Sequence, residues 1–178
     1  MTDYRFKKVA VLGAGVMGAQ IAAHLANANV PVVLFDLAAE GADKNAIVNK
    51  ALANLGKLSP APLASKAIAQ RIAAANYDEH LEQLKDCDLI IEAIAERLDW
   101  KKSLYAKILP FVGAKTVLAS NTSGLSINAL SEVLDESLHH RFCGVHFFNP
   151  PRYMHLVELI PCSSTDADVL SSLESFLV

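Results

Sequence analysis

The 178-residue sequence has no excess of basic residues, few cysteines and no long apolar run. It has 16 Lys and Arg residues and 19 Asp and Glu residues, which is too little positive charge for nucleic acid to be a main partner. The three cysteines form no C-x-x-C pair, and their odd number indicates free thiols in a reducing compartment. No signal-peptide segment and no run of ~18 apolar residues is present, so we expect a cytoplasmic protein that does not bind membranes.

What the sequence does contain is an alternation of short β-branched runs with longer helical stretches, which is typical of βαβ units in a parallel sheet. A chain of this length buries roughly 70% of its unfolded surface and needs no disulfide or structural metal. Strands are predicted at 9–12, 32–35, 72–75, 89–91, 116–119, 142–148 and 156–160. Helices are predicted at 19–29, 78–85, 99–109, 127–134 and from 165 onward, with two more between 38 and 74.

A Gly-x-Gly-x-x-Gly motif joins the first predicted strand to the first predicted helix, at Gly13, Gly15 and Gly18. In this context the glycines permit a tight turn, a close approach of backbone to a pyrophosphate, and close packing of the helix on the strand. The start of the helix offers free N–H groups to the phosphates. Asp36 ends the second strand, where its carboxylate would bind ribose hydroxyls and repel a 2′-phosphate, so NAD is favoured over NADP.

Two ionisable residues interrupt the last two apolar strands, His146 in one and Glu158 in the other. If these strands fold back antiparallel about Arg152, opposed residue numbers sum to 304, which pairs His146 with Glu158 on one face. A carboxylate beside an imidazole fixes its tautomer and makes it a better general base. In an NAD site that base would remove the hydroxyl proton of an alcohol; a purely structural ion pair is the alternative.

The polar turn Ser120–Gly124 follows another strand, at the sheet edge where open α/β folds bind ligands. Its hydroxyls and amide suit a substrate oxygen or the nicotinamide end of a cofactor. The alternative is an ordinary capping turn for the next helix. Glu96 and Lys101 lie near the same edge, where by themselves they indicate only a solvated turn, and the other histidines show no metal-binding spacing.

Taken together, the motifs GAGVMG, IIEAIAE, SNTSGL, HFFNPP and LVELI resemble the NAD-binding domain of the L-3-hydroxyacyl-CoA dehydrogenase family. The resemblance covers nearly the whole chain and implies a Rossmann-type, doubly wound, mainly parallel sheet with an antiparallel strand near its C-terminal end. It implies NAD-dependent oxidation of (3S)-3-hydroxyacyl-CoA to 3-ketoacyl-CoA in fatty acid β-oxidation.

The resemblance also implies roles for individual residues. His146 would be the base, Glu158 its orienting partner, and Ser123 the residue that holds the substrate oxygen. The residues that it assigns to the cofactor are Gly13, Gly15, Val16, Met17, Gly18, Asp36, Ala95, Glu96, Lys101, Ser123 and Asn149.

A second, helical domain of that family, which carries substrate and dimer contacts, has no counterpart in residues 1–178, so this stretch is expected to be the NAD-binding domain alone. An acyl-CoA substrate and either a homodimer or fusion to an enoyl-CoA hydratase module are implied for the full-length protein. Two other interpretations are a dehydrogenase of another β-hydroxy acid, which would need a lysine base, and a non-catalytic dinucleotide-binding protein of the same fold.

Overall fold

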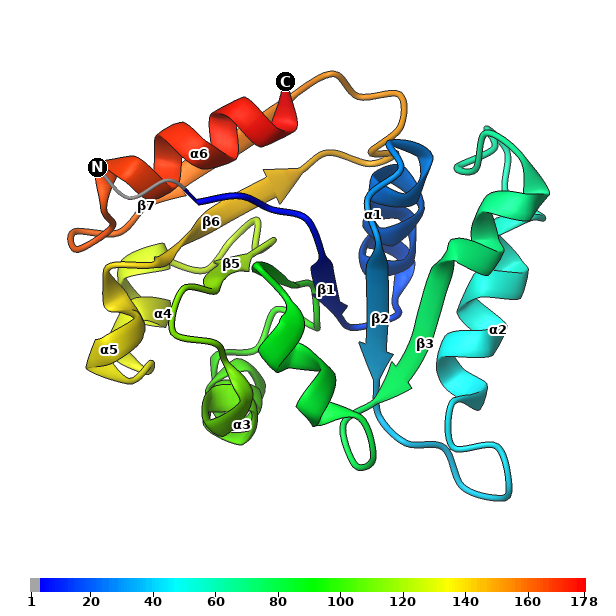
Figure 1. Cartoon of the computed structure of the whole chain (residues 1–178), viewed down its shortest axis with the longest axis horizontal. Helices are drawn as coiled ribbons and strands as arrows, with labels where there is room; N and C mark the ends of the chain where they lie inside the picture. The colour runs from blue at the N-terminus through cyan, green and yellow to red at the C-terminus, as the bar shows by residue number, and fades with distance from the viewer. Residues whose placement is uncertain (1–3) are drawn as a thin grey trace.

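The computed structural model describes residues 4–178 as one sheet of seven strands between two layers of helices (Figure 1). The strands are β1 (Val9–Leu12), β2 (Val32–Asp36), β3 (Ile72–Asn76), β4 (Leu89–Glu92), β5 (Val117–Ser120), β6 (Phe142–Phe147) and β7 (Val157–Pro161). The α-helices are α1 (Val16–Asn27), α2 (Ala46–Leu55), α3 (Leu98–Ile108), α4 (Ile127–Glu132), α5 (Glu136–His139) and α6 (Ala167–Leu177). Short 3₁₀ helices are η1 (Lys66–Arg71), η2 (Leu81–Asp86) and η3 (Leu109–Phe111).

The strand order is β3-β2-β1-β4-β5-β6-β7, and every neighbouring pair is parallel except β6 with β7. The predicted doubly wound sheet with an antiparallel strand near its C-terminal end is therefore confirmed. The chain reverses its direction of travel across the sheet between β1 and β4. In open α/β sheets the carboxyl ends of the strands at such a switch point form the ligand crevice.

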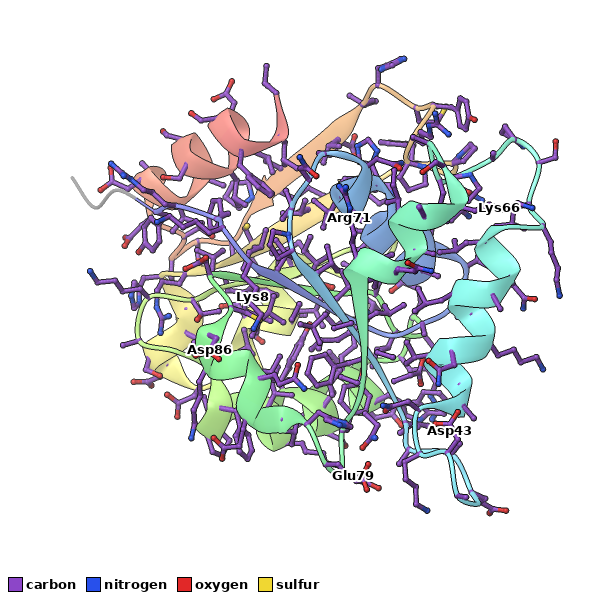
Figure 2. All side chains as sticks on the ribbon, turned by 45° about the vertical axis from the view of Figure 1, so that its right-hand side comes forward. Lys8, Asp43, Lys66, Arg71, Glu79 and Asp86 are labelled. Atoms are coloured by element: carbon purple, nitrogen blue, oxygen red, sulfur yellow. The ribbon has the colours of Figure 1, made fainter. Side chains whose placement is uncertain are left out.

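Alternate residues of each strand enter opposite layers, as the period of two requires. Val9 and Val11 pack on the layer of α1, α2 and α6, whereas Ala10 and Leu12 pack on the layer of α3, α4 and α5. Burial on both sides explains why β1 and β4 are continuous apolar runs rather than alternating ones. Charged side chains such as Asp43, Lys66 and Glu79 lie at the periphery (Figure 2).

Some predicted helices differ in the structure. The prediction of a helix at 78–85 was wrong in type, since the chain forms the 3₁₀ turn η2, and the second helix expected before residue 74 is the 3₁₀ turn η1. Short connecting segments of this kind often adopt the tighter 3₁₀ form. The predicted helix at 127–134 ends early because Asp135 accepts a hydrogen bond from the Ser137 amide (3.0 Å) and so caps a new helix, α5.

The three cysteines are free and buried. Burial raises the pKa of Cys87 to about 11 and that of Cys143 to about 12, so both thiols stay protonated near neutral pH. None of the helices in residues 4–178 has the length and apolar character that crossing a membrane requires.

Candidate active site

The turn after β1 depends on two glycines that leave no room for a side chain. Gly13 has a φ of +103°, and a Cβ placed on it would lie 2.8 Å from the Ala93 carbonyl oxygen. A Cβ on Gly18 would overlap the carbonyl oxygen of Gly13, so α1 touches the end of β1 at this position. Gly15 faces open space, which leaves its backbone accessible to a ligand.

The N-terminus of α1 is open to an anion. The helix begins at Val16 with no side-chain cap and no acidic residue in its first turn. Its first N–H groups have no partner inside the helix, and no acidic side chain of its own first turn neutralises the positive end of the helix dipole. A backbone cradle of this kind fits the pyrophosphate of a dinucleotide.

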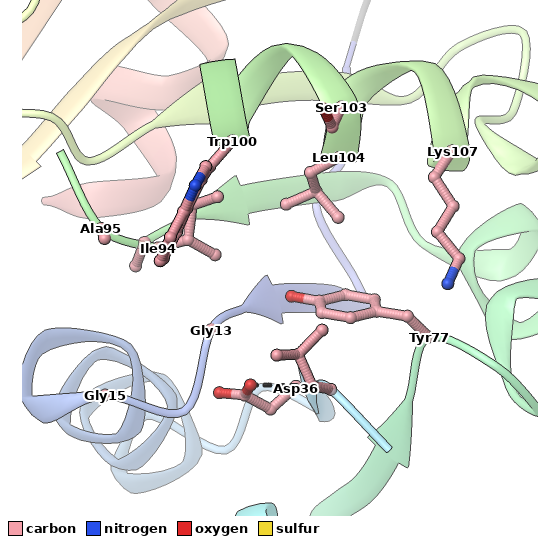
Figure 3. A pocket seen from close by; sticks show the side chains of 12 residues that line it. Gly13, Gly15, Asp36, Tyr77, Ile94, Ala95, Trp100, Ser103, Leu104 and Lys107 are labelled. Carbon is pink, nitrogen blue, oxygen red and sulfur yellow. Dashed lines mark hydrogen bonds between the residues drawn. The ribbon is translucent and has the colours of Figure 1, made fainter. Parts of the chain in front are cut away.

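Asp36 stands at the carboxyl end of β2, beside that helix start. Its carboxylate accepts hydrogen bonds from the backbone amides of Ala14 (2.6 Å) and Leu37 (2.7 Å), which fixes its orientation. Asp36 lines a cavity of 540 Å³ together with Gly13 and Tyr77 (Figure 3). The acid that the sequence assigned to the ribose thus faces the space next to the glycine turn.

The predicted pairing of His146 with Glu158 is confirmed by the strand register. The two residues are direct partners in the antiparallel β6–β7 pair, and His146 Nδ1 lies 2.9 Å from Glu158 Oε2. The histidine side chain is 17% exposed and the glutamate side chain 49% exposed, so the pair lies at the rim of the cleft. The Phe148 ring lies 4.6 Å from the imidazole between ring centres and covers one side of it.

A second cavity, of 510 Å³, brings the catalytic candidates together. Its wall includes His146, Ser123, Asn149, Glu96 and Met17. The two cavities share four wall residues, Gly15, Ala93, Ile94 and Ala95. They therefore form two compartments of one cleft that passes the glycine turn, with Asp36 at one end and His146 at the other.

Glu96 holds the Ser120–Gly124 turn in place. It accepts hydrogen bonds from the Thr122 hydroxyl (2.6 Å), the Ser123 amide (2.6 Å) and the Ser123 hydroxyl (3.1 Å). Burial works to raise the pKa of Glu96, but these hydrogen bonds and the charge of Lys101 outweigh it and lower that pKa. The charged carboxylate therefore fixes the Ser123 side chain at the wall of the second cavity.

The capping alternative for this turn is not what the structure shows, because a later residue caps α4. The Ser126 hydroxyl accepts the hydrogen bond from the Ala129 amide (3.3 Å). Ser120 and Thr122 turn inward instead, and Asn121 accepts a hydrogen bond from the Phe147 amide (2.9 Å). The turn is thus tied to β6, next to His146.

Asn149 lies on the cavity wall just after β6 and is oriented by a buried residue of α1. Gln20, which is 7% exposed, donates from Nε2 to Asn149 Oδ1 (3.2 Å). With its oxygen engaged, Asn149 keeps its amide hydrogens for a group inside the compartment.

Lys101, assigned to the cofactor on resemblance, lies inside the protein. Its ammonium is 2.6 Å from Glu92 Oε1, and the two side chains are 1% and 0% exposed. Glu92 also accepts hydrogen bonds from Tyr105 (3.0 Å), Ser120 (2.7 Å) and the Ile94 amide (2.7 Å). Burial first, and the Glu92 charge second, raise the pKa of Tyr105, which keeps its hydroxyl protonated as a donor. A direct contact of Lys101 with cofactor stays a prediction.

Not every predicted residue lines the cleft. Val16 is 69% exposed and borders a separate groove of 420 Å³ between α1 and α2, and Gly18 serves helix packing. Glu92 was not predicted as a site residue, although the sequence gives an indication of it, because an acid directly follows the apolar run Leu89–Ile91. The sequence gives no such indication for Gln20 and Trp100, because their place in the cleft depends on tertiary packing.

The strand order, the glycine turn at the start of α1 and the acid at the end of β2 define a Rossmann-type dinucleotide-binding domain. A family model described as "3-hydroxyacyl-CoA dehydrogenase, NAD binding domain" matches residues 8–178. The chain belongs to this family, and NAD is its cofactor.

The names of similar proteins agree with this family assignment. The chain is 45% identical over 172 residues to a fatty acid oxidation complex trifunctional enzyme of Rickettsia felis, covering 96% of this chain and 24% of that protein. It is 36% identical over 174 residues to a 3-hydroxybutyryl-CoA dehydrogenase of Bradyrhizobium diazoefficiens, covering 96% and 57%. The crystal structure of 3-hydroxybutyryl-CoA dehydrogenase from Escherichia coli matches with a TM-score of 0.80 and 32% identity, covering 97% and 36%. The chain thus spans about a quarter to somewhat over half the length of these proteins.

Proposed function

We propose that this chain is the cofactor-binding part of an NAD-dependent 3-hydroxyacyl-CoA dehydrogenase, which oxidises (3S)-3-hydroxyacyl-CoA to 3-ketoacyl-CoA in fatty acid β-oxidation. The observation that carries the proposal is the His146–Glu158 pair, which opens into the same cleft as the glycine turn. A structural ion pair would have no reason to face a cofactor cleft, whereas a general base must do so.

Glu158 sets the chemistry of the histidine. When Glu158 accepts the hydrogen bond from Nδ1–H, Nε2 is the ring nitrogen left to take a proton. During oxidation Nε2 removes the proton from the substrate 3-hydroxyl, and the neighbouring carboxylate stabilises the imidazolium that forms. NAD, when bound, supplies the acceptor for the hydride that leaves carbon 3.

Ser123 and Asn149 would position the reactants. Both line the compartment that contains His146, and each is held by a second residue, Glu96 for Ser123 and Gln20 for Asn149. On substrate binding, Ser123 would turn its hydroxyl from Glu96 to the substrate oxygen while its backbone amide stays bonded to Glu96. Asn149 would donate to the nicotinamide end of the cofactor. Side chains that are held in advance reduce the entropy lost in reaching the reactive geometry.

The adenosine end of the cofactor would lie in the other compartment. There the Asp36 carboxylate would accept hydrogen bonds from the ribose hydroxyls, and its charge would disfavour a 2′-phosphate. The proposal includes an acyl-CoA substrate, a helical substrate and dimerisation domain beyond this stretch or fusion to an enoyl-CoA hydratase module, and a cytoplasmic location.

The test uses full-length protein and the chain of 178 residues side by side. We expect both to bind NADH and only the full-length protein to reduce acetoacetyl-CoA efficiently. His146→Ala in the full-length protein should reduce turnover on the order of 10²–10⁴-fold and leave NADH affinity nearly unchanged. Equal loss of turnover and NADH affinity would mean that His146 is structural, and full activity of the variant would refute its role as base.

A further inference from the structure

The compartment beside Asp36 is walled largely by apolar side chains. Leu104 and Trp100 extend into it from α3, and Ile94 and Tyr77 border it from the ends of β4 and β3 (Figure 3). Asp36 accounts for recognition of a ribose, but nothing assigned so far accounts for these apolar walls.

Trp100 is the feature of this wall that most calls for a ligand. It is the single tryptophan of the chain, and it is 51% exposed in the first turn of α3. A large aromatic side chain left half in water at a cavity mouth loses the stabilisation that burial would give, roughly 25 cal/mol for each Å² exposed. Figure 3 shows the indole beside Ile94 at the edge of the pocket.

The indole is also held in place. The Arg97 guanidinium lies over it, 4.7 Å from the ring centre. Arg97 in turn donates two hydrogen bonds to Asp99, from Nε (3.1 Å) and from one terminal nitrogen (2.7 Å). A cation over one face of an aromatic ring attracts it and limits its rotation. The ring thus held lines the cavity.

The order of groups along a dinucleotide decides what that partner is. With the pyrophosphate at the start of α1 and the ribose at Asp36, the next group outward from the ribose is adenine. Asp36 and Trp100 line one compartment, so adenine enters the space that Trp100 borders. We propose that Trp100, backed by Arg97, is the stacking platform for the adenine ring of the cofactor. This rests on the proposed function, because it takes the cleft to be an NAD site.

The position of the tryptophan provides a direct readout. Because the chain has one tryptophan, its fluorescence reports on this position alone. We expect AMP, which carries adenine and ribose but no nicotinamide, to quench the fluorescence saturably, and NADH to do the same. Nicotinamide mononucleotide, which has no adenine, should leave it unchanged.

Calorimetric titration of variants gives the second readout. Base–aromatic stacking is worth about 1–3 kcal/mol by alanine substitution, so Trp100→Ala should weaken the binding of AMP and of NADH alike by about 5- to 150-fold. Trp100→Phe should restore most of the affinity, because a phenyl ring still stacks. Leu98→Ala is the matched control: Leu98 is 39% exposed in the same turn of α3 but does not line the compartment.

The outcomes distinguish a failure of the adenine platform from a failure of the NAD site. If AMP leaves the fluorescence unchanged, or if Trp100→Ala binds AMP and NADH as tightly as wild type, the stacking platform is refuted while the NAD site stands. If wild-type protein binds no NADH, the proposed function falls, and the adenine platform falls with it.

Discussion

Lys101→Met should destabilise the protein through the buried Glu92 carboxylate. Lys101 and Glu92 are 2.6 Å apart and almost fully buried, so the substitution leaves an anion without its cation inside the fold. Removing one partner of a buried ion pair costs about 3–5 kcal/mol. Glu92 keeps its bonds from Tyr105 and Ser120, which places the loss near the lower end, ~3 kcal/mol.

Thermal unfolding measures this loss. For a domain of this size 1 kcal/mol corresponds to about 2–4 °C, so the Tm should fall by roughly 6–12 °C. Lys102→Met is the control, because Lys102 is the next residue of α3 but is exposed. Adding Glu92→Gln to Lys101→Met removes the stranded charge and should recover part of the Tm, which a double-mutant cycle would report as coupling.

The same variant distinguishes a structural cation from a cofactor contact. If Lys101 acts through Glu92, a lower Tm accompanies the substitution, and NADH affinity measured well below the Tm changes little. An unchanged Tm together with a large loss of NADH affinity would refute the assignment and would show that Lys101 binds the cofactor directly.

Three further predictions concern the cleft. Gly18→Ala should destabilise the protein by about 3 kcal/mol in chemical denaturation, because a Cβ at this position has no room. Gly124→Ala is the control and should be nearly neutral, because a Cβ there meets open space. Equal loss of stability in the two variants would contradict the close packing of Gly18. Asp36→Asn should raise the affinity for NADPH relative to NADH on the order of tenfold, because the carboxylate that repels the 2′-phosphate is removed. An unchanged ratio of the two affinities in titrations would contradict this. The pKa of Glu96 is lowered in the fold, so its charged form stabilises the protein above the ordinary glutamate pKa. Wild type should therefore unfold at higher denaturant than Glu96→Gln at pH 7, and this advantage should vanish as the pH falls below about 4; a constant difference would exclude the carboxylate as its source.

Local rules were sufficient for the parts of the site that depend on neighbouring residues. The glycine turn is a contiguous motif, and the facing of His146 and Glu158 follows from one turn and the period of two along strands. The parallel sheet followed from the alternation of strand and helix signals, and the family resemblance added that it is doubly wound. In these features the interacting residues are close in sequence, so backbone geometry allows few other arrangements.

Other features depend on how a helix is rotated over the sheet, which the sequence does not state locally. The Glu92–Lys101 pair spans nine positions from β4 into α3, and an acid followed by a lysine reads equally well as a solvated turn. Gln20 and Asn149 are 129 positions apart and meet only because α1 packs beside the end of β6. The 3₁₀ turns η1 and η2 share the composition of α-helices, so propensity alone did not distinguish them.

The antiparallel β6–β7 pair has a consequence for how such a domain can be reused. Because two adjacent strands hold His146 and Glu158 in register, the proposed general base is assembled by the same unit that would hold the cofactor. A module joined to this unit would then contribute the surface that selects and shields a substrate. The named relatives differ in how much of their length the chain spans, 24% in one and 57% in another, as expected if different lengths of protein are joined to one such unit.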